Sequence, residues 1–215
     1  MSSILKPRDR ELVERKLAEG VRGKVRIVNF TQQFECEYCD MTRRLLEEIS
    51  ELNDRIKLEL YDFQDDAALA EKWRVDKIPA TLIFGEREYM LRFFGVPSGY
   101  EFGTLIEDII DVSKGSSRLS PQAKELAKTI DRPLHIQVFV TPTCPYCPRA
   151  VRAAHQMAIE NPYVTADMVE VIEFPHLARR YDVMAVPKTV VNDKISFEGA
   201  LPETHYIHHV LEALK

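Results

Sequence analysis

The chain has 215 residues, of which 45% are hydrophobic and 29% charged, and its net charge is −5. This mild acidity argues against a protein that binds the nucleic-acid backbone, because such proteins are normally basic. The sequence has no run of 18 apolar residues, and its first ten residues lack the apolar core of a signal peptide. We therefore expect a cytoplasmic protein that binds neither nucleic acid nor membrane.

The first part of the chain alternates predicted helices and strands. Apolar spacing predicts helix, strand, helix, strand, helix, a two-stranded hairpin and helix, at residues 8–19, 24–31, 36–50, 56–63, 65–74, 81–84 with 88–94, and 99–113. A small, polar stretch at 113–120 then predicts a joint between two units. Ser120 is a good N-cap for the next helix, since Pro121 follows at its first position.

The second part repeats the same order of elements. The predicted elements lie at residues 121–130, 134–140, 144–160, 167–173, 175–181, 188–198 and 203–214. Both parts therefore follow the order αβαβαββα. We expect two domains, at residues 1–115 and 116–215, each large enough to bury a modest core.

Two Cys-x-x-Cys motifs use all four cysteines and carry the strongest repeat signal. Cys36-Glu-Tyr-Cys39 and Cys144-Pro-Tyr-Cys147 lie 108 residues apart, and a proline follows the first cysteine of each motif by 43 residues, at Pro79 and Pro187. This shared offset indicates an internal duplication. Because no cysteine remains for a structural disulfide, the pattern fits a cytosolic redox protein or a metal protein.

A dithiol at this spacing can close to a disulfide and reopen, which is the chemistry of thiol–disulfide exchange. Each first cysteine is predicted to follow a strand and to begin a helix, where free backbone N–H groups and the helix dipole favour a thiolate. Cys36 and Cys144 are therefore the predicted nucleophiles. Cys39 and Cys147, one helical turn later, are the predicted resolving cysteines.

The two dithiols are not equivalent in charge. Glu35 and Glu37 flank Cys36, and nearby carboxylates disfavour a thiolate. The spacer after Cys144 is uncharged, and Arg149 is close in sequence. We expect Cys144 to ionise more readily and to be the more reactive thiol, although a thiol that ionises near ambient pH attacks fastest.

Strand, Cys-x-x-Cys, helix and an Ile/Val-Pro pair before a hairpin together resemble the thioredoxin fold. This resemblance implies an α/β protein of two tandem thioredoxin-like units, each with a mixed central sheet flanked by helices. It also implies cis bonds at Ile78-Pro79 and Val186-Pro187. In this family the residue before the proline offers its backbone to an extended substrate, so these four residues are the predicted substrate-binding positions.

Two fused units with two intact dithiols resemble the protein disulfide oxidoreductases of thermophilic archaea and bacteria, and Thr141–Cys147 is similar to glutaredoxins. The resemblance implies an enzyme that reduces, oxidises or isomerises disulfides of protein substrates without a bound cofactor. The chain lacks the glycine-rich dinucleotide motifs. Its electrons are expected from an NADPH-dependent, thioredoxin-reductase-like flavoprotein. The many charged residues favour a thermophilic source.

One departure from the thioredoxin pattern concerns the proton acceptor for the resolving cysteine. Thioredoxins carry a buried aspartate in the strand before the dithiol, where this chain has Asn29 and Val138. Glu59, Asp62 and Glu170 on neighbouring strands are candidate substitutes.

Three other functions are open at this point. The N-terminal part of the alkyl hydroperoxide reductase flavoprotein also fuses two such units, keeps one dithiol and relays electrons to a peroxidase partner. A glutathione-dependent glutaredoxin is a second alternative. A structural Cys₄ zinc site is a third, but its cysteine pairs usually lie about 15–20 residues apart. His205, His208 and His209 have helical spacing that suits a transition metal, although histidines on a terminal helix more often face solvent. No metal is expected.

Overall fold

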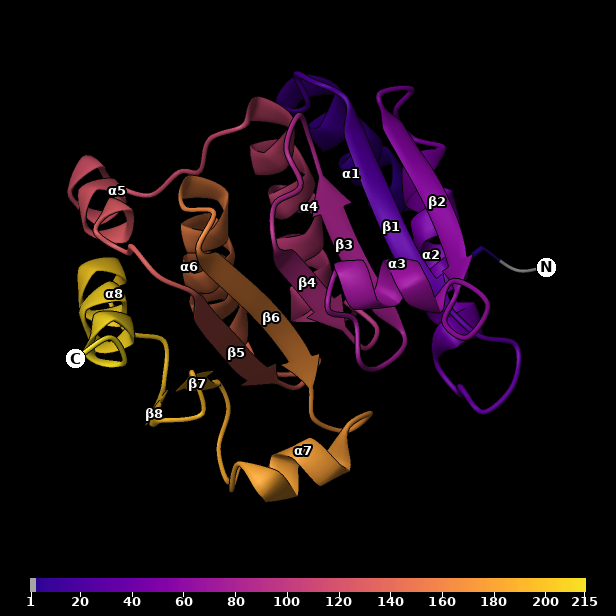
Figure 1. Ribbon diagram of the computed structural model, residues 1–215. Coiled ribbons are helices and arrows are strands. Elements are labelled where there is room, and N and C mark those ends of the chain that lie inside the picture. The colour runs from indigo at the N-terminus through magenta and orange to yellow at the C-terminus, as the bar shows by residue number, and fades with distance from the viewer. Residues whose placement is uncertain (1–2) are drawn as a thin grey trace.

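The computed structural model describes residues 3–215 as one α/β layer structure (Figure 1). The helices are α1 Pro7–Gly20, α2 Cys39–Ser50, α3 Ala67–Lys72, α4 Tyr100–Lys114, α5 Pro121–Lys128, α6 Cys147–Glu160, α7 Pro175–Arg180 and α8 Glu203–Glu212. The strands are β1 Val25–Thr31, β2 Ile56–Asp62, β3 Ala80–Phe84, β4 Leu91–Phe94, β5 Leu134–Val140, β6 Val164–Glu170, β7 Lys188–Val191 and β8 Ile195–Glu198. The predicted order αβαβαββα is confirmed in both parts of the chain. Within residues 3–215, no helix has the length and apolar character that crossing a membrane requires.

We call the part from α1 to α4 the first half and the part from α5 to β8 and α8 the second half. Each half contributes four strands, and the eight form one sheet in the order β2-β1-β3-β4-β6-β5-β7-β8. The seam between the halves is the parallel pair β4 and β6, from Leu91 opposite Ala166 to Phe94 opposite Val169. The expected two sheets are therefore joined into one.

Strand directions place the ends of β1 and β5 at the same edge of the sheet. Strand β3 is antiparallel to both β1 and β4, while β4 and β6, and β6 and β5, are parallel pairs. It follows that β1, β4, β6 and β5 all point the same way, as Figure 1 shows. Both cysteine motifs follow the carboxyl ends of their strands and so lie along this edge.

Two predicted strands are wrong in their limits. The strand expected at 167–173 is β6, Val164–Glu170. A turn ends it, because the N–H of Glu173 donates to Glu170 Oε2 over 2.8 Å and the N–H of Phe174 to the Glu170 carbonyl over 3.1 Å. Apolar alternation continues through this turn and gave no sign of it. The second strand of the first hairpin begins at Leu91 rather than at residue 88.

The two faces of the sheet are covered unequally. One core takes side chains from α1, α2, α4, α5, α6 and α8. The core on the opposite face is smaller and receives helical cover only from α3 and α7 within the described residues. Large aromatic residues fill it, with Trp73 beside Phe84 at 5.3 Å between ring centroids.

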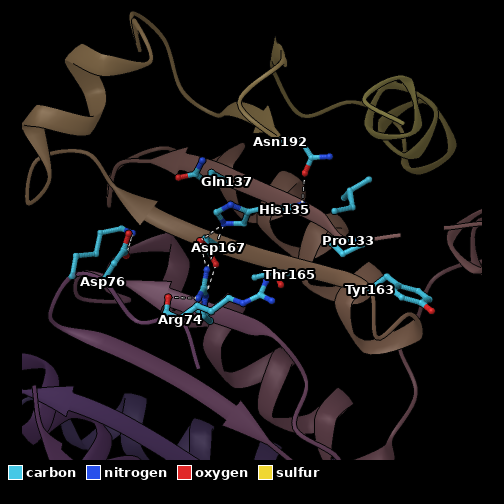
Figure 2. A pocket seen from close by; sticks show the side chains of 12 residues that line it. Arg74, Asp76, Pro133, His135, Gln137, Tyr163, Thr165, Asp167 and Asn192 are labelled. Atoms are coloured by element: carbon cyan, nitrogen blue, oxygen red, sulfur yellow. Dashed lines mark hydrogen bonds and ion pairs between the residues drawn. The ribbon is translucent and has the colours of Figure 1, made fainter. Parts of the chain in front are cut away.

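A buried ion pair crosses the seam on this thinly covered face. Arg92 in β4 donates to both carboxylate oxygens of Asp167 in β6, from Nε and Nη2, each over 2.7 Å. His135 Nε2 lies 2.6 Å from the same carboxylate, and Figure 2 shows the two side chains pointing toward each other. Burial opposes ionisation of Asp167, but Arg92 and His135 together hold its pKa well below its usual range.

These residues line a pocket of about 250 Å³. Arg92 Nη1 also donates to the carbonyls of Trp73 and Arg74, over 3.0 and 2.6 Å. Since the guanidinium and the carboxylate satisfy each other, we interpret the cluster as a tie between the halves.

A second buried network crosses the seam on the other face, between α4 and α6. Arg152 in α6 pairs with Asp108 and Asp111 in α4, and His155 Nδ1 lies 2.6 Å from Asp108 Oδ2. Both aspartates are fully buried. The two helices therefore lie side by side, and each begins at the edge of the sheet that carries the cysteine motifs.

Candidate functional site

Both dithiols are closed as disulfides at one edge of the sheet. Cys36 is bonded to Cys39 and Cys144 to Cys147, with 5.5 Å between the Cα atoms in each pair. The expectation that the first cysteine begins the helix is wrong, because α2 and α6 begin at Cys39 and Cys147. The first cysteine instead lies in the turn before the helix. There the N–H of Cys147 lies 3.1 Å from Cys144 Sγ.

Strand positions separate the two disulfides and exclude a shared metal. Strands β3, β4 and β6 lie between β1 and β5, so the two strand ends are about 19 Å apart at the usual spacing. Zinc–sulfur bonds are about 2.3 Å long, so the four cysteines cannot reach one zinc ion, and the Cys₄ alternative is wrong.

The described residues contain no cluster of three metal-ligating side chains. On α8, His205 and His208 are exposed, and His209 stacks on Phe197 with 5.2 Å between ring centroids. The solvent-facing interpretation of these histidines fits better than a metal site.

Burial distinguishes the cysteines of each motif. Cys39 and Cys147 are 1% and 0% exposed, whereas Cys36 is half-buried and Cys144 is 7% exposed. A groove of about 470 Å³ opens beside Cys36, between Arg43 of α2 and Tyr61 of β2. In each motif the first cysteine is therefore the more exposed of the two, although Cys144 is itself almost fully buried.

The predicted prolines lie beside the strands that carry the dithiols. Ile78-Pro79 and Val186-Pro187 are both cis, as the resemblance implied. Pro79 precedes β3, whose first residue Ala80 pairs with Phe30 at the end of β1. Cys144 Sγ lies 3.7 Å from the carbonyl oxygen of Val186.

The two sites share one backbone feature around the proline. The N–H of Gly95 donates to the Pro79 carbonyl, and the N–H of Gly199 donates to the Pro187 carbonyl, each over 2.9 Å. The hairpin of each half therefore closes against its own proline.

The candidate proton acceptors have other roles or other locations. Glu59 is paired with Arg26 and Lys57, so its pKa is lowered although burial opposes this. Asp62 accepts the N–H groups of Gln64 and Asp65 in a turn.

Glu170 and Asn29 are the two other positions that bear on the proton acceptor for a resolving cysteine. Glu170 is 3% exposed and lies at the end of β6 beside Gly95 of the first half. Asn29, at the place of the thioredoxin aspartate, donates to the Ala80 carbonyl over 3.0 Å.

Glu101 is an acidic residue that the sequence reasoning missed. It lies in the first turn of α4, is 1% exposed, and neither of its carboxyl oxygens has a hydrogen-bond partner among the described residues. Burial, with a contribution from Asp108, raises its pKa to about 7. The adjacent N–H of Tyr100 donates to the carbonyl of Pro142, two residues before Cys144. The first turn of α4, in the first half, thus contacts the loop that leads to the dithiol of the second half.

Tandem thioredoxin-like halves with a dithiol in each define a thiol–disulfide oxidoreductase. A family described as Thioredoxin domain matches residues 134–212. A protein disulfide oxidoreductase from Aeropyrum pernix is 30% identical, with a TM-score of 0.90 over 97% of this chain and 93% of that chain. The chain belongs to the same family of tandem thioredoxin-fold oxidoreductases as the Aeropyrum protein.

Other relatives are components of longer proteins. The N-terminal domain of the alkyl hydroperoxide reductase AhpF from Enterococcus faecalis superposes with a TM-score of 0.89 at 24% identity, over 96% of this chain and 99% of that chain. The F component of alkyl hydroperoxide reductase from Staphylococcus aureus is 28% identical over 152 residues, which is 70% of this chain and 27% of that protein. An NADH dehydrogenase from Ferdinandcohnia aciditolerans is 24% identical over 164 residues, 73% of this chain. The chain spans 32% of the length of that dehydrogenase.

Proposed function

We propose that this protein is a protein-disulfide oxidoreductase that uses both dithiols on protein substrates. The observation that carries the proposal is the placement of two Cys-x-x-Cys disulfides at one edge of a continuous sheet. The redox potentials of the two dithiols relative to those of their partners set the physiological direction, whether reduction, oxidation or isomerisation.

In the reducing direction the thiolate of Cys36 or Cys144 attacks a substrate disulfide. One substrate sulfur forms a mixed disulfide with the enzyme, and the other leaves as a thiol after taking a proton. Cys39 or Cys147 then attacks the enzyme sulfur, releases the second substrate thiol and closes the enzyme disulfide. Two electrons pass to the substrate in each cycle, and a reductant must reopen the dithiol.

The backbone beside each proline is the proposed substrate-binding surface. Ile78 and Val186, each half-buried next to its proline, would present their backbone to an extended peptide. At the second site this places the peptide next to the attacking sulfur, because Val186 O and Cys144 Sγ are 3.7 Å apart.

Exposed apolar side chains near the dithiols support a protein substrate. Phe34, two residues before Cys36, is 76% exposed, and Tyr146, within the second motif, is 69% exposed. Ile172 in the loop after β6 and Met184 before Pro187 are 62% and 84% exposed. Such apolar exposure is typical of surfaces that bind other proteins, and an unfolded substrate offers matching apolar segments.

Glu101 is the proposed proton acceptor for Cys147. Helices α4 and α6 lie side by side and begin at the same edge, with Glu101 in the first turn of one and Cys147 the first residue of the other. A carboxyl whose pKa is about 7 can take a thiol proton and return it near neutral pH.

The proposal includes a reducing partner and a location. The chain has no glycine-rich dinucleotide motif, so the proposed electron donor is an NADPH-dependent, thioredoxin-reductase-like flavoprotein. A cytoplasmic location is proposed because all four cysteines belong to redox motifs and none is reserved for a structural disulfide.

We further propose that residues 1–115 and 116–215 are the two duplicated units. Gly115, with a φ of +64°, ends α4 in the left-handed conformation that favours glycine. The segment after it leads to α5, where the repeated order of elements begins again.

Paired substitutions test the proposed function. With dithiothreitol as electron source, the protein should reduce the disulfides of a generic protein substrate. Cys144→Ser with Cys147→Ser should lose more activity than Cys36→Ser with Cys39→Ser, because Glu35 and Glu37 disfavour a Cys36 thiolate. Turnover is followed by thiol release. An unaltered rate after removal of all four sulfurs would contradict the proposal, and equal losses would contradict the electrostatic argument.

A dedicated electron relay is the second candidate, and the likeness to the alkyl hydroperoxide reductase AhpF favours it. A relay would need one dithiol and a specific oxidised partner. Retention of full activity toward a peroxidase partner by the Cys36→Ser, Cys39→Ser variant, together with absence of activity on protein disulfides, would select this function.

A further inference from the structure

The two glycine–proline contacts have different surroundings. Gly95 and Gly199 have φ angles of +95° and +90° and make the same 2.9 Å bond to their prolines. A methyl group at Gly95 would lie 2.8 Å from Glu170 Cβ and 2.9 Å from Glu173 Oε1. At Gly199 it would meet no atom within 4 Å. Only the first site has its glycine covered by another part of the chain.

The cover comes from the loop that follows β6 in the second half. Glu173 Oε1 accepts the N–H of Val96 over 2.7 Å, directly after Gly95. The loop is fixed at its start, because the N–H of Val171 donates to the Val140 carbonyl over 3.0 Å. Val140 ends the strand that leads to the second dithiol. The loop at residues 171–173 is thus bonded to the end of β5 at one side and to Val96 at the other. Gly95, next to Val96, is in turn bonded to Pro79.

We propose that Glu173 is a positioning residue for the first dithiol, supplied by the second half, which holds residues 95–96 against Pro79. The proposal rests on the proposed role of Pro79 beside Cys36. Glu173 does not touch the reacting sulfurs. It acts through the hairpin whose Gly95 bonds to Pro79, and the second site has no counterpart at Gly199.

Charge adds a pH dependence to this contact. The groups that face Glu173 are Glu170 at the end of β6 and Glu37 and Tyr38 in the first dithiol loop. Burial, with Glu170 and Glu37, raises the pKa of Glu173 to about 7. Above that pH the new carboxylate disfavours a thiolate in the adjacent dithiol. Below it, the neutral carboxyl still accepts the Val96 N–H through its carbonyl oxygen.

The test uses the full chain with the second dithiol replaced by Cys144→Ser and Cys147→Ser. Glu173→Ala, which removes the acceptor, should lower kcat/KM of the first dithiol about tenfold, because loss of positioning costs rate. Glu173→Gln keeps an acceptor oxygen and should stay within about twofold at pH 6. At pH 8.5 the kcat/KM of Glu173→Gln should be about threefold higher than that of the chain with Glu173 intact, since the variant lacks the carboxylate charge.

A matched pair provides the control for both strain and folding. Gly95→Ala and Gly199→Ala impose the same positive-φ cost, but only Gly95→Ala pushes against the second half, at both Glu170 and Glu173. Gly95→Ala should impair the first dithiol, and Gly199→Ala should leave the second within about twofold in the Cys36→Ser, Cys39→Ser chain. Urea unfolding of each variant identifies any that fail to fold, and the remaining variants then decide the question.

The potential of the first dithiol, measured by equilibration with dithiothreitol and thiol alkylation, gives a readout without turnover. A shift of this potential in Glu173→Ala and in Gly95→Ala supports the proposal. It does so even if the first dithiol is inactive on protein substrates, because such inactivity would count only against the proposed function. An unchanged potential together with an unchanged kcat/KM overturns it. Equal impairment by Glu173→Gln and Glu173→Ala at pH 6, or equal effects on both dithiols, also overturns it.

Discussion

Glu101 keeps a proton in the folded chain that it would release on unfolding. Its pKa rises from 4.5 to about 7 on burial. Between these two pH values the unfolded chain has lost the proton and the folded chain has not. Stability therefore falls as pH rises from about 4.5 to 7 and levels off above, by at most about 3 kcal/mol.

Glu101→Gln should remove this pH step. Relative to the unmodified protein, the variant should have a larger free energy of unfolding at pH 8 than at pH 5, because the amide carries no charge at either pH and only the parent loses stability as pH rises. Urea unfolding at both pH values measures the difference. The exposed Glu86→Gln is the matched control. A constant difference between Glu101→Gln and the parent across this range would mean that Glu101 ionises normally.

Residue identity predicted the dithiols and prolines of the site but not Glu101. Cysteine and proline spacing located both dithiols and both prolines, because these residues have restricted chemistry and geometry. Glu101 gave no signal, since an acid in the first turn of a helix is usually exposed and favoured by the helix dipole. Its burial results from the packing of α4 on α6, which depends on residues far along the chain.

The strand pair β4–β6 is the element on which the single sheet depends. Arg92→Ala should cost about 3–5 kcal/mol in the free energy of unfolding, because it leaves the Asp167 carboxylate buried without its guanidinium. Urea unfolding checks this value. Arg87→Ala, in the exposed part of the same hairpin, is the control, and because it loses only its contact with the Tyr89 ring it should cost no more than about 1 kcal/mol.

A second substitution separates charge from packing at this seam. Replacing Arg92 and Asp167 together by leucine removes both charges and should recover much of the loss, since buried ion pairs are often matched by apolar pairs. A double variant as unstable as Arg92→Ala would indicate that the lost contacts to the Trp73 and Arg74 carbonyls matter more than the unpaired charge.

Element order was predictable, whereas strand partners across the seam were not. Local periodicity gave the order αβαβαββα in both halves. The pairing of Leu91–Phe94 with Ala166–Val169 is set by tertiary packing, for which a short apolar run carries no specific code. The turn after Glu170 was missed for a related reason. The strand ends where the Glu170 side chain accepts the N–H of Glu173, and no glycine or proline marks the place.

At the scale of the whole molecule, two dithiols that follow strand ends about 19 Å apart at one edge of the sheet can engage one substrate chain. A mixed disulfide at one site would raise the effective concentration of the substrate at the other. The intact protein should therefore refold a scrambled multi-disulfide protein faster than an equimolar mixture of the two single-dithiol variants. Recovery of the substrate's own activity provides the measurement.

Substitution suits this comparison better than cutting the chain near Gly115. A cut would separate β4 from β6 and expose a strand edge, so that the halves would differ from the intact protein in more than their dithiols. Identical refolding by the intact protein and the mixture would show that the two sites work as independent catalysts.

The seam also sets an order of events during synthesis. The first half ends before residue 116, but the strand that completes its sheet, Val164–Glu170, is made about fifty residues later. Until those residues have left the ribosome, Leu91–Phe94 is an open edge with unpaired backbone groups, which other strands can join. A growing chain that stalls between the two halves would thus present an incomplete, aggregation-prone sheet. The first half is therefore expected to rely on rapid completion of translation, or on a chaperone, more than a lone thioredoxin-like unit would.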